Sequence, residues 1–480
     1  MPGSHLTWLS SRERFGVKLG LDSVQALLAE LGDPHIDLPA VLVAGTNGKG
    51  STAAMIAAVL TAAGRKTLLY TSPHVASVSE RIRVDGKPIR RDALERRLGQ
   101  VRAAVTRMKR SGRLAQQPTY FEVMTAAALL QARAARVTGA VFEVGLGGRY
   151  DATNVIPAAI AVITGIELDH TEFLGTTLKK IAWNKAGIIK KDQTVLTLES
   201  RPDLLGVFRR ECRLQGAKLI VIPGNSARRL PGPNSPARGQ TDRWNMDLGS
   251  ARRGAAGTLL PERLSGVSLG LRGPRQGPQA VLALAAAGGL LQATAAEPGS
   301  ASVHRLRQGP TLRPLAAAAL RRALAGVHLR GRFELRSLSR RRTLVADAAH
   351  NPAAAVLLAD EVRQLAGKRP VTLLFGALDD KDAAAMLRPL LNVVDNVNLT
   401  SIQHRRGMKT GELQELALCD PPSRGAVHDG ALGVTVFSSS RRAWRAALKA
   451  TPPGGILLVA GSFYLLGELW PFIRRHPLRP

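Results

Sequence analysis

Cysteine is nearly absent from this chain. Its 480 residues include only Cys212 and Cys419, which lie far apart in the sequence and lack the spacing of metal ligands. Two such residues exclude a disulfide framework and a cysteine-based zinc site. So little cysteine agrees with a reducing compartment, and we expect a cytoplasmic protein.

Long apolar segments are absent as well. The first 20 residues are mixed and polar, without an apolar core of signal-peptide length. The apolar segment at residues 456–466 is too short to cross a bilayer and is interrupted by Gly461 and Ser462. We therefore expect no membrane partner.

Acidic residues are scarce: 36 Asp and Glu stand against 67 Lys and Arg, a formal net charge of +31. Such an excess attracts polyanions, among them nucleic acids, nucleoside triphosphates and glutamate-rich substrates. The basic residues are dispersed, however, and aromatic residues make up only 4% of the chain. This pattern favours compositional drift over a dedicated nucleic-acid surface.

Short apolar runs alternate with helical patterns along most of the chain, which predicts an α/β fold with a mainly parallel sheet. In the first part, strands are expected at residues 40–44, 66–70, 139–144, 159–164, 193–198 and 218–222. Helices are expected between them, for example at 52–63 and 122–136.

The composition changes after residue 223, where Pro, Gly, Ser and Arg dominate to about residue 261. Residues 224–240 have no periodicity, which predicts a long loop or a poorly ordered insertion. Helices are expected at 279–292 and 313–324, with a loop at 297–312.

A second α/β pattern begins near residue 331. Its expected strands are 343–346, 371–375, 394–399, 433–437 and 455–460, and its expected helices include 351–365 and 441–450. The sequence thus predicts two domains, residues 1–327 with a loop-rich insert at about 223–262, and residues 328–480.

The clearest chemical motif is a glycine-rich turn between an apolar strand and a helix. It consists of Gly45, Thr46, Asn47, Gly48, Lys49, Gly50 and Ser51. Glycines let backbone N–H groups approach phosphate oxygens, and the helix N-terminus adds partial positive charge. Lys49 can reach the β- and γ-phosphates, with the Ser51 hydroxyl nearby. The motif departs from the usual G-x-x-x-x-G-K-[ST] pattern because Gly50 separates the lysine from the serine.

This turn resembles the phosphate loop of the folylpolyglutamate synthase branch of the Mur ligase superfamily. Further strings agree in order: Thr71-Ser72-Pro73-His74, Glu80-Arg81-Ile82, Thr119-Tyr120-Phe121-Glu122, residues 143–154, Leu168-Asp169-His170, Lys185-Ala186-Gly187-Ile188, Gly331-Arg332-Phe333-Glu334, residues 347–352, Asp380-Lys381-Asp382 and Gly461-Ser462. The resemblance covers most of the chain except roughly residues 223–270 and 295–325.

The resemblance implies an N-terminal P-loop ATPase domain and a smaller, Rossmann-like C-terminal domain with the site between them. It implies an ATP- and Mg²⁺-dependent ligase that adds L-glutamate to dihydropteroate or to reduced folates through an acyl phosphate. Members are commonly monomers, so we expect a monomer that acts on small molecules.

Metal-binding roles follow from the same resemblance. Glu143 is the expected central magnesium ligand, in keeping with the preference of Mg²⁺ for hard oxygen donors. Ser51 and Ser72 are expected near the same metal. His170, oriented by Asp169, and Lys185, which is carbamoylated in this family, are expected at a second metal. The residue types alone also allow a structural glutamate, a core histidine, a Ser-Pro turn and a phosphate-paired lysine.

Substrate-binding roles are implied in the same way. Thr119, Phe121, Asp151 and Ala152 match the pterin pocket, and His350 and Ser462 match positions for glutamate. For the nucleotide, Arg332 matches a γ-phosphate ligand, Asp347 lies near the ribose and Gln276 near the adenine. The expected catalytic residues are Lys49, Glu143, His170, Lys185 and Arg332. An ordinary core phenylalanine remains the alternative for Phe121.

Several positions depart from the family pattern. Asn184 replaces a glutamate, and Arg275 and Gln279 flank Gln276 in place of the usual histidine and asparagine. Pro274 and Pro278 are expected to disturb the helix that starts there. Two rival functions remain open: a cell-wall Mur-type amide ligase, and a degenerate relative that binds nucleotide or nucleic acid without ligase activity.

Overall fold

The computed structural model of the chain describes residues 4–13, 16, 20–230, 243–295, 314–419 and 433–479. The loop expected at 297–312 lies outside the described residues. No helix within these described ranges is long and apolar enough to cross a membrane.

The first sheet has eight strands in the order β4-β3-β2-β5-β1-β6-β7-β8, and all pairs are parallel except those made by β3. The strands are β1 (Ala40–Ala44), β2 (Thr67–Tyr70), β3 (Ile82–Val84), β4 (Lys87–Pro88), β5 (Gly139–Glu143), β6 (Ile160–Ile163), β7 (Thr194–Thr197) and β8 (Lys218–Val221). The predicted strands of this part agree with them to within one or two residues, the usual uncertainty of element ends.

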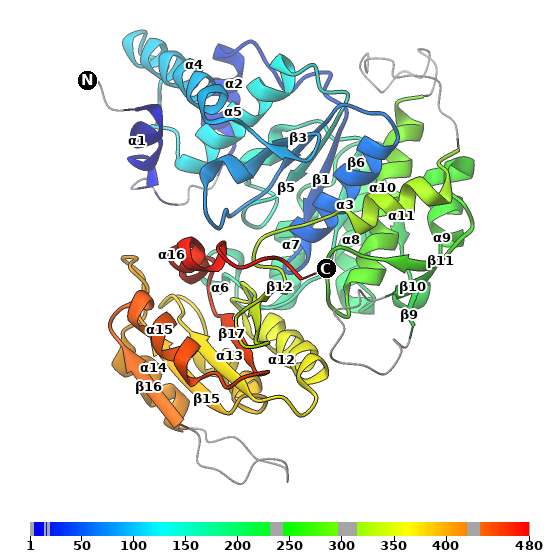
Figure 1. Cartoon of the computed structure of the whole chain (residues 1–480). Helices are drawn as coiled ribbons and strands as arrows, with labels where there is room; N and C mark the ends of the chain where they lie inside the picture. The colour runs from blue at the N-terminus through cyan, green and yellow to red at the C-terminus, as the bar shows by residue number, and fades with distance from the viewer. Residues whose placement is uncertain are drawn as a thin grey trace.

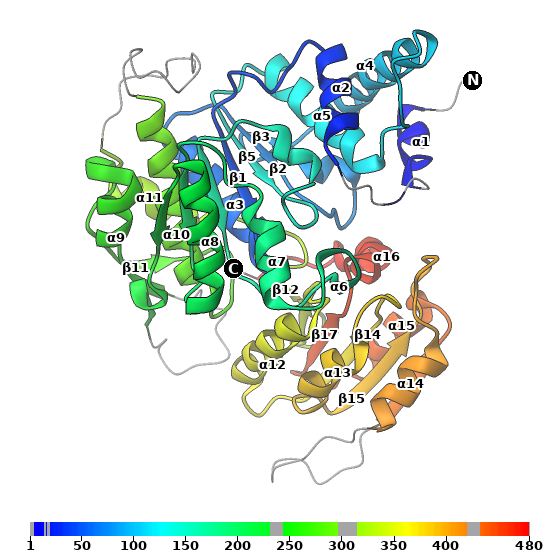
Figure 2. The same cartoon turned by 180° about the vertical axis from the view of Figure 1, so that it is seen from behind.

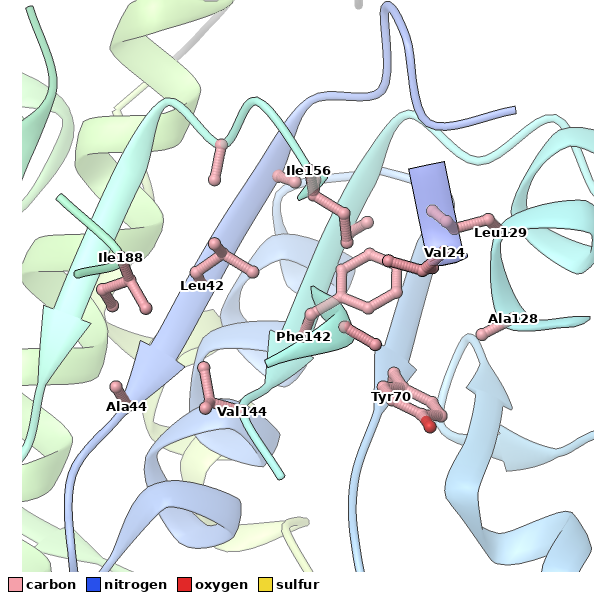
Figure 3. Close-up of a cluster of buried hydrophobic side chains, with 14 of the residues drawn as sticks. Val24, Leu42, Ala44, Tyr70, Ala128, Leu129, Phe142, Val144, Ile156 and Ile188 are labelled. Carbon is pink, nitrogen blue, oxygen red and sulfur yellow. The ribbon is translucent and has the colours of Figure 1, made fainter. Parts of the chain in front are cut away.

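Helices cover both faces of this sheet, because alternate strand residues point to opposite sides. The helices of this part are α1 (His5–Ser10), α2 (Asp22–Glu30), α3 (Lys49–Ala62), α4 (Arg91–Arg110), α5 (Tyr120–Ala134), α6 (Thr171–Leu174), α7 (Leu178–Ala186), α8 (Pro202–Gln215), α10 (Gln276–Ala293) and α11 (Ala317–Ala325). On one face, Phe142 of β5 and Leu42 of β1 pack with Val24 of α2 and Leu129 of α5 (Figure 3). On the other face, Val41 and Val43 join a core with α3 and α10.

The insert after residue 223 corrects the sequence interpretation. β9 (Ala227–Arg229), within the loop expected at 224–240, and β10 (Arg243–Asp247), within the region of changed composition, pair with β11 (Arg263–Ser268) in an antiparallel three-stranded sheet. Residues 231–240 of the expected loop lie outside the described residues. A short helix, α9 (Gly249–Ala251), a π-helical segment (Arg252–Ala256) and a 3-10 turn (Gly257–Leu259) connect β10 to β11. The buried side chains of β10 are Trp244 and Met246, alternate residues that contact the α10 side of the core.

The expected disturbance at the start of α10 is also wrong. The helix begins at Gln276, with Pro278 in its first turn. The N–H groups of a first turn have no partner within the helix, so proline costs no hydrogen bond there.

The second sheet has six strands in the order β12-β13-β17-β14-β15-β16, parallel except for β12. They are β12 (Glu334–Ser337), β13 (Thr343–Ala346), β14 (Val371–Phe375), β15 (Asn396–Thr400), β16 (Gly433–Phe437) and β17 (Ile456–Ala460). Its helices are α12 (Pro352–Ala366), α13 (Ala383–Leu391), α14 (Thr410–Cys419), α15 (Ser440–Ala450) and α16 (Phe463–Ile473). The predicted α/β class with a mainly parallel sheet is confirmed.

Figures 1 and 2 show the two parts side by side, with α16 of the second part lying toward the first. Val75, from the segment after β2, packs into the core formed by α15 and α16. The carboxyl ends of parallel strands are where α/β sheets place their ligand sites. In the first sheet these ends carry the phosphate loop after β1 and Glu143 at the end of β5.

Candidate active site

The glycine-rich turn between β1 and α3 has a backbone that only glycine accommodates at two positions. Gly45 and Gly48 have φ values of +141° and +83°, in the region that disfavours side chains. A Cβ at Gly45 would lie 1.9 Å from Thr164 Oγ1, and one at Gly48 would lie 2.1 Å from Gln279 Nε2. The turn is thus packed closely on the residues after β6 and on α10, as a preorganised phosphate loop requires.

Glu143 meets this turn directly. As the last residue of β5 it pairs with β1 through Val43, and its side chain is almost fully buried. The backbone N–H of Ser72 donates to Glu143 Oε2 at 2.9 Å. A Cβ added to Gly50 would lie 3.3 and 3.4 Å from the two carboxylate oxygens. The carboxylate therefore faces the first turn of α3, within the phosphate loop.

Glu143 and Lys49 are buried together. Burial raises the pKa of Glu143, and the charge of Lys49 opposes that shift. Burial likewise lowers the pKa of Lys49, opposed by Glu143 and Asp169. Lys49 Nζ donates to the carbonyl of Thr46 at 3.0 Å, within its own loop. Lys49 and Glu143 thus each oppose the effect of burial on the other's pKa, at the position where a triphosphate would bring further negative charge.

A crevice of about 100 Å³ brings most of the predicted nucleotide and metal residues together. The predicted residues that line it are Gly45, Thr46, Asn47, Gly48, Lys49, Ser72, Glu143, His170, Lys185, Arg332 and His350. A small cavity of about 30 Å³ adjoins it and includes Gly50. We call the first of these the phosphate crevice.

Lys185 and His170 are among the residues that line the phosphate crevice. Lys185 is buried at the end of α7, and its amine donates to the carbonyl of Gly45 at 2.7 Å. Burial, with a smaller effect of Lys49, lowers the pKa of Lys185 to about 7. His170 precedes α6 in a left-handed conformation, φ +50°, which is rare for a residue with a side chain and common at functional sites. Burial lowers its pKa to about 4, so the imidazole is neutral.

The donors of the phosphate crevice fit a magnesium ion that is bound together with a triphosphate. Within the described ranges no group of three or more His, Cys, Asp or Glu side chains could hold a metal by itself. Mg²⁺ commonly takes one or two protein oxygens and completes its shell with phosphate oxygens and water. The buried carboxylate of Glu143, facing the phosphate loop, meets that requirement.

A larger cavity of about 350 Å³ opens beside the phosphate crevice. It is lined by the remaining predicted substrate residues: Thr119, Phe121, Asp151, Ala152, His350 and Ser462. Ser72, His170, His350 and Phe463 line both spaces. We call this space the acceptor cavity.

The apolar end of the acceptor cavity is built on the start of α5. Thr119 caps this helix in a capping box with Glu122, and Phe121 follows in the first turn. The ring of Phe121 lies against Gly145, where a Cβ would be 2.6 Å from the ring. Asp151 accepts hydrogen bonds from Gly145 N and Leu146 N at 3.0 and 2.9 Å, which fixes the loop below the ring. A flat heterocycle can stack in such a place.

Besides Gly50, which lines only the small cavity, three predicted residues lie outside both linings. Ser51 is buried in the first turn of α3. Gln276 begins α10, and its Oε1 is buried without a hydrogen-bond partner among the described residues. Asp347 accepts from Phe333 N at 2.7 Å and Ala349 N at 2.8 Å, beside the linker that carries Arg332. Their assigned roles stay predictions.

Sequence reasoning gave no site role to Lys381. Its amine donates to Asp169 Oδ1 at 2.9 Å, and Asn351 Nδ2 donates to Asp169 Oδ2 at 3.3 Å. Asn351 Nδ2 also donates to Asn47 Oδ1 at 3.0 Å, across to the phosphate loop. Since Lys381 follows β14 and Asp169 follows β6, only the position of polar residues after apolar strands could have indicated this contact.

Comparison with known proteins agrees with this geometry. The chain matches the family models of the Mur ligase middle domain over residues 43–200 and of the Mur ligase, glutamate ligase domain, over residues 331–463. A dihydrofolate synthase/folylpolyglutamate synthase of Escherichia coli (strain K12) is 32% identical over 475 residues, which cover 97% of this chain and 95% of that protein.

Solved structures of similar proteins extend over the whole fold. The structure of E. coli FolC in complex with DHPP and ADP is 29% identical, with a TM-score of 0.77 over 99% of this chain and 98% of that chain. The Yersinia pestis bifunctional folylpolyglutamate synthase/dihydrofolate synthase, complexed with AMPPNP and Mn ion, is 26% identical, with a TM-score of 0.76 over 98% of both chains. The chain belongs to the dihydrofolate synthase/folylpolyglutamate synthase family of Mur ligases.

Proposed function

We propose that this protein joins L-glutamate to the carboxylate of a pterin-bearing acceptor, either dihydropteroate or a reduced folate, at the expense of ATP. One observation carries the proposal: the carboxylate of Glu143 faces the phosphate loop in the crevice that Lys49 also lines, and this crevice shares Ser72, His170 and His350 with the acceptor cavity. The complexes of the E. coli and Y. pestis relatives with ADP, AMPPNP and Mn ion support ATP and a divalent cation, Mg²⁺ in this proposal.

The chemistry follows from the poor reactivity of a carboxylate. An acceptor carboxylate oxygen attacks the γ-phosphorus of ATP, the bond to the β-phosphate oxygen breaks, and ADP leaves. The amine of glutamate then attacks the acyl carbon, the carbon–oxygen bond to phosphate breaks, and the amine loses a proton. Positioning and electrostatic stabilisation are the main means by which proteins accelerate phosphoryl transfer.

Residues of the phosphate crevice supply those two effects. We assign Lys49 and the backbone N–H groups of residues 45–50 to the β- and γ-phosphates. Arg332 lies in the same crevice, with its guanidinium 4.9 Å from the centre of the Phe463 ring. A guanidinium can hold phosphate oxygens through two parallel hydrogen bonds, so Arg332 is proposed to bind the γ-phosphate.

Glu143, with Ser72 and Ser51 nearby, would hold the magnesium ion, which neutralises charge on the phosphates when bound. We propose that His170 and a carbamoylated Lys185 serve a second metal. Carbamoylation adds CO₂ to a neutral amine and releases a proton. A pKa of about 7 leaves much of Lys185 as the reactive neutral amine near pH 7, which supports this assignment.

The acceptor cavity provides for the two organic substrates. Thr119, Phe121, Asp151 and Ala152 are proposed to bind the pterin ring. His350 and Ser462, which belong to the second part of the chain and line the same cavity, are proposed to bind the incoming glutamate. Burial lowers the pKa of His350 to about 4, and Nδ1 lies 2.8 Å from the carbonyl of Ala348. A neutral ring that donates there from Nδ1 leaves Nε2 free to accept a proton or a hydrogen bond.

For the molecule as a whole, we propose two domains, residues 1–327 and 328–480, and a monomer that acts in the cytoplasm. Both cysteines are free, Cys212 buried and Cys419 exposed, which suits a reducing compartment.

Phosphate release by the purified protein tests this function. The mixtures contain ATP, Mg²⁺ and L-glutamate with dihydropteroate, tetrahydrofolate or no acceptor. Release that needs both glutamate and one of these acceptors is the expected result. A requirement for a UDP-linked sugar peptide instead, or no release with any acceptor together with salt-sensitive RNA or DNA binding, would overturn the proposal.

A further inference from the structure

The part of the acceptor-cavity lining that comes from the second sheet contains an arginine to which no role has been assigned. Arg406 lies in the turn that follows β15 and lines the acceptor cavity together with Asp380 and Tyr464. Its neighbour Arg405 is exposed and is not one of the residues that line this cavity. Polar residues after a parallel strand commonly contact ligands, and Arg406 occupies such a position.

The turn that carries Arg406 is fixed to the end of β14. The N–H of Asp379 donates to the carbonyl of Arg406 at 2.8 Å, and the N–H of Met408 donates to the carbonyl of Ala377 at 3.1 Å. The N–H of Arg406 donates to the His404 ring, which in turn packs on Tyr464 with ring centres 4.4 Å apart. These contacts hold the turn, and with it the backbone of Arg406, in place before any substrate arrives, which reduces the entropy cost of binding.

The guanidinium has hydrogen-bonding capacity that the described protein does not use. One nitrogen, Nη1, donates to Asp380 Oδ2 at 3.1 Å. Arg406 Nε and Asp380 Oδ1 are both buried without a hydrogen-bond partner among the described residues. A buried donor without an acceptor is costly and calls for an explanation at this pair, whereas the rest of the guanidinium, on a side chain that is 41% exposed, is open to a ligand in the acceptor cavity. Carboxylates are the ligands that the planar guanidinium recognises best.

The position of Arg406 shows which carboxylate this can be. Ser72, His170 and His350 line both the phosphate crevice and the acceptor cavity, so the reacting carboxylate must lie near them. Arg406 and Asp380 line only the acceptor cavity. A carboxylate bound at Arg406 is therefore not the one that receives phosphate.

Resting on the proposed function, we propose that Arg406 binds the α-carboxylate of a glutamate that the acceptor already carries. Dihydropteroate has a single carboxylate, which is the reacting one, so it offers no group to Arg406. A folate with a γ-linked glutamate tail offers one α-carboxylate for each glutamate. Arg406 is thus a specificity-determining residue for glutamylated acceptors, the class that chain extension requires.

Binding measurements with two ligands that differ by one glutamate test this assignment. Dihydropteroate and dihydrofolate are titrated by calorimetry into the full-length protein with ADP and Mg²⁺, as wild type, Arg406→Met, Arg406→Lys and the matched control Arg405→Met. Loss of a charged hydrogen bond predicts dihydrofolate binding weaker by about tenfold or more in Arg406→Met. In the same variant, the affinity for dihydropteroate should change by less than about twofold. Arg406→Lys should recover part of the lost dihydrofolate affinity, and Arg405→Met should bind both ligands as the wild type does.

Equal weakening of both ligands in Arg406→Met, or no weakening of either, would overturn the proposal. So would a higher KM for L-glutamate with dihydropteroate as acceptor, because that result would place the incoming glutamate at Arg406. If the wild type bound neither dihydropteroate nor dihydrofolate, the proposed function itself would be refuted. Near-equal binding of dihydropteroate by wild type and Arg406→Met shows that the variant is folded.

Discussion

The amine of Lys381 lies 2.9 Å from a carboxylate oxygen of Asp169, and this ion pair joins the two halves of the molecule across the active site. Burial alone would raise the pKa of Asp169, but its electrostatic interactions with His170, Lys381 and His350 and the hydrogen bond from Lys381 outweigh burial, so the pKa is lowered. Asp169 is therefore a charged carboxylate at neutral pH. It follows β6 of the first sheet and accepts hydrogen bonds from Lys381 and Asn351 of the second part of the chain.

The first prediction concerns this ion pair. Asp169→Asn keeps the shape of the side chain but removes the charge that holds Lys381 and its turn against the first part. Because small misplacements of reacting groups are costly, kcat/KM should fall about 100-fold. Phosphate-release kinetics give the value, and Asp360→Asn, which changes an exposed ion pair on α12, is the control. Equal activity of the two variants would show that the ion pair does not position the halves.

The second prediction concerns Glu143. Glu143→Gln preserves an oxygen that can accept from Ser72 N but removes the charge proposed to hold magnesium. Turnover should fall about 1000-fold, by analogy with the loss of a preorganised electrostatic group. Because burial raises the pKa of Glu143, its charge costs stability, so the melting temperature of the variant should not fall. Unchanged turnover would remove the assigned role.

The third prediction uses two glycines with the same backbone conformation. Gly48 and Gly64 have φ values of +83° and +79°. A Cβ added at Gly48 would collide with Gln279, whereas a Cβ added at Gly64 would have no atom within 4 Å. Both alanine variants should lose about 1–2 kcal/mol of stability from strain. Gly48→Ala should additionally raise the KM for ATP about tenfold, because the collision displaces the phosphate loop. Urea unfolding and ATP kinetics separate the two effects, and a normal KM in Gly48→Ala would contradict this.

Much of this fold could be predicted from the sequence, because parallel strands are short apolar runs and the phosphate loop is a continuous segment. β1, β13, β14 and β16 have the predicted bounds. The small sheet was missed because β9 has only three residues, and because β10 alternates Trp244 and Met246 within an arginine-rich segment. Contacts such as Lys381 with Asp169 join residues 212 positions apart, and the local sequence indicates only that each residue follows an apolar strand.

Arg406 illustrates the same limit at the site. In the sequence it is one of two adjacent arginines in a strongly basic chain, and nothing separates it from Arg405. Only the turn that places Arg406 beside Asp380 in the acceptor cavity distinguishes the two. The site residues that the sequence predicted are those that belong to a sequence motif of the family, such as Glu143 and Lys185.

The fourth prediction concerns pH. Burial lowers the pKa of Lys190 to about 7, and its amine donates to Asn154 Oδ1 at 3.0 Å and the Ile156 carbonyl at 2.7 Å. Between pH 7 and the unfolded pKa, the unfolded chain binds a proton that the folded chain lacks. Stability therefore rises with pH in this window, with a slope of at most ~1.4 kcal/mol per pH unit from this group.

Urea unfolding at pH 7, 8 and 9 measures this slope. The free energy of unfolding of the wild type, minus that of Lys190→Met, should increase with pH. Lys191→Met, which removes the exposed neighbouring lysine, should show no such trend against the wild type. A difference between wild type and Lys190→Met that stays constant with pH would show that Lys190 is charged in the folded protein at neutral pH.

The last prediction concerns Asn184, where the family usually has glutamate. Asn184 Nδ2 donates to the carbonyl of Leu174 at 3.1 Å, which ties α7 to the end of α6, the helix that His170 precedes. Neither aspartate nor glutamate can donate this hydrogen bond. Asn184→Asp and Asn184→Glu should therefore each lower kcat up to about tenfold, while Asn184→Gln, which keeps a donor, should lose less. If Asn184→Glu matched the wild type in kcat, the amide donor would not be what positions His170 in this chain.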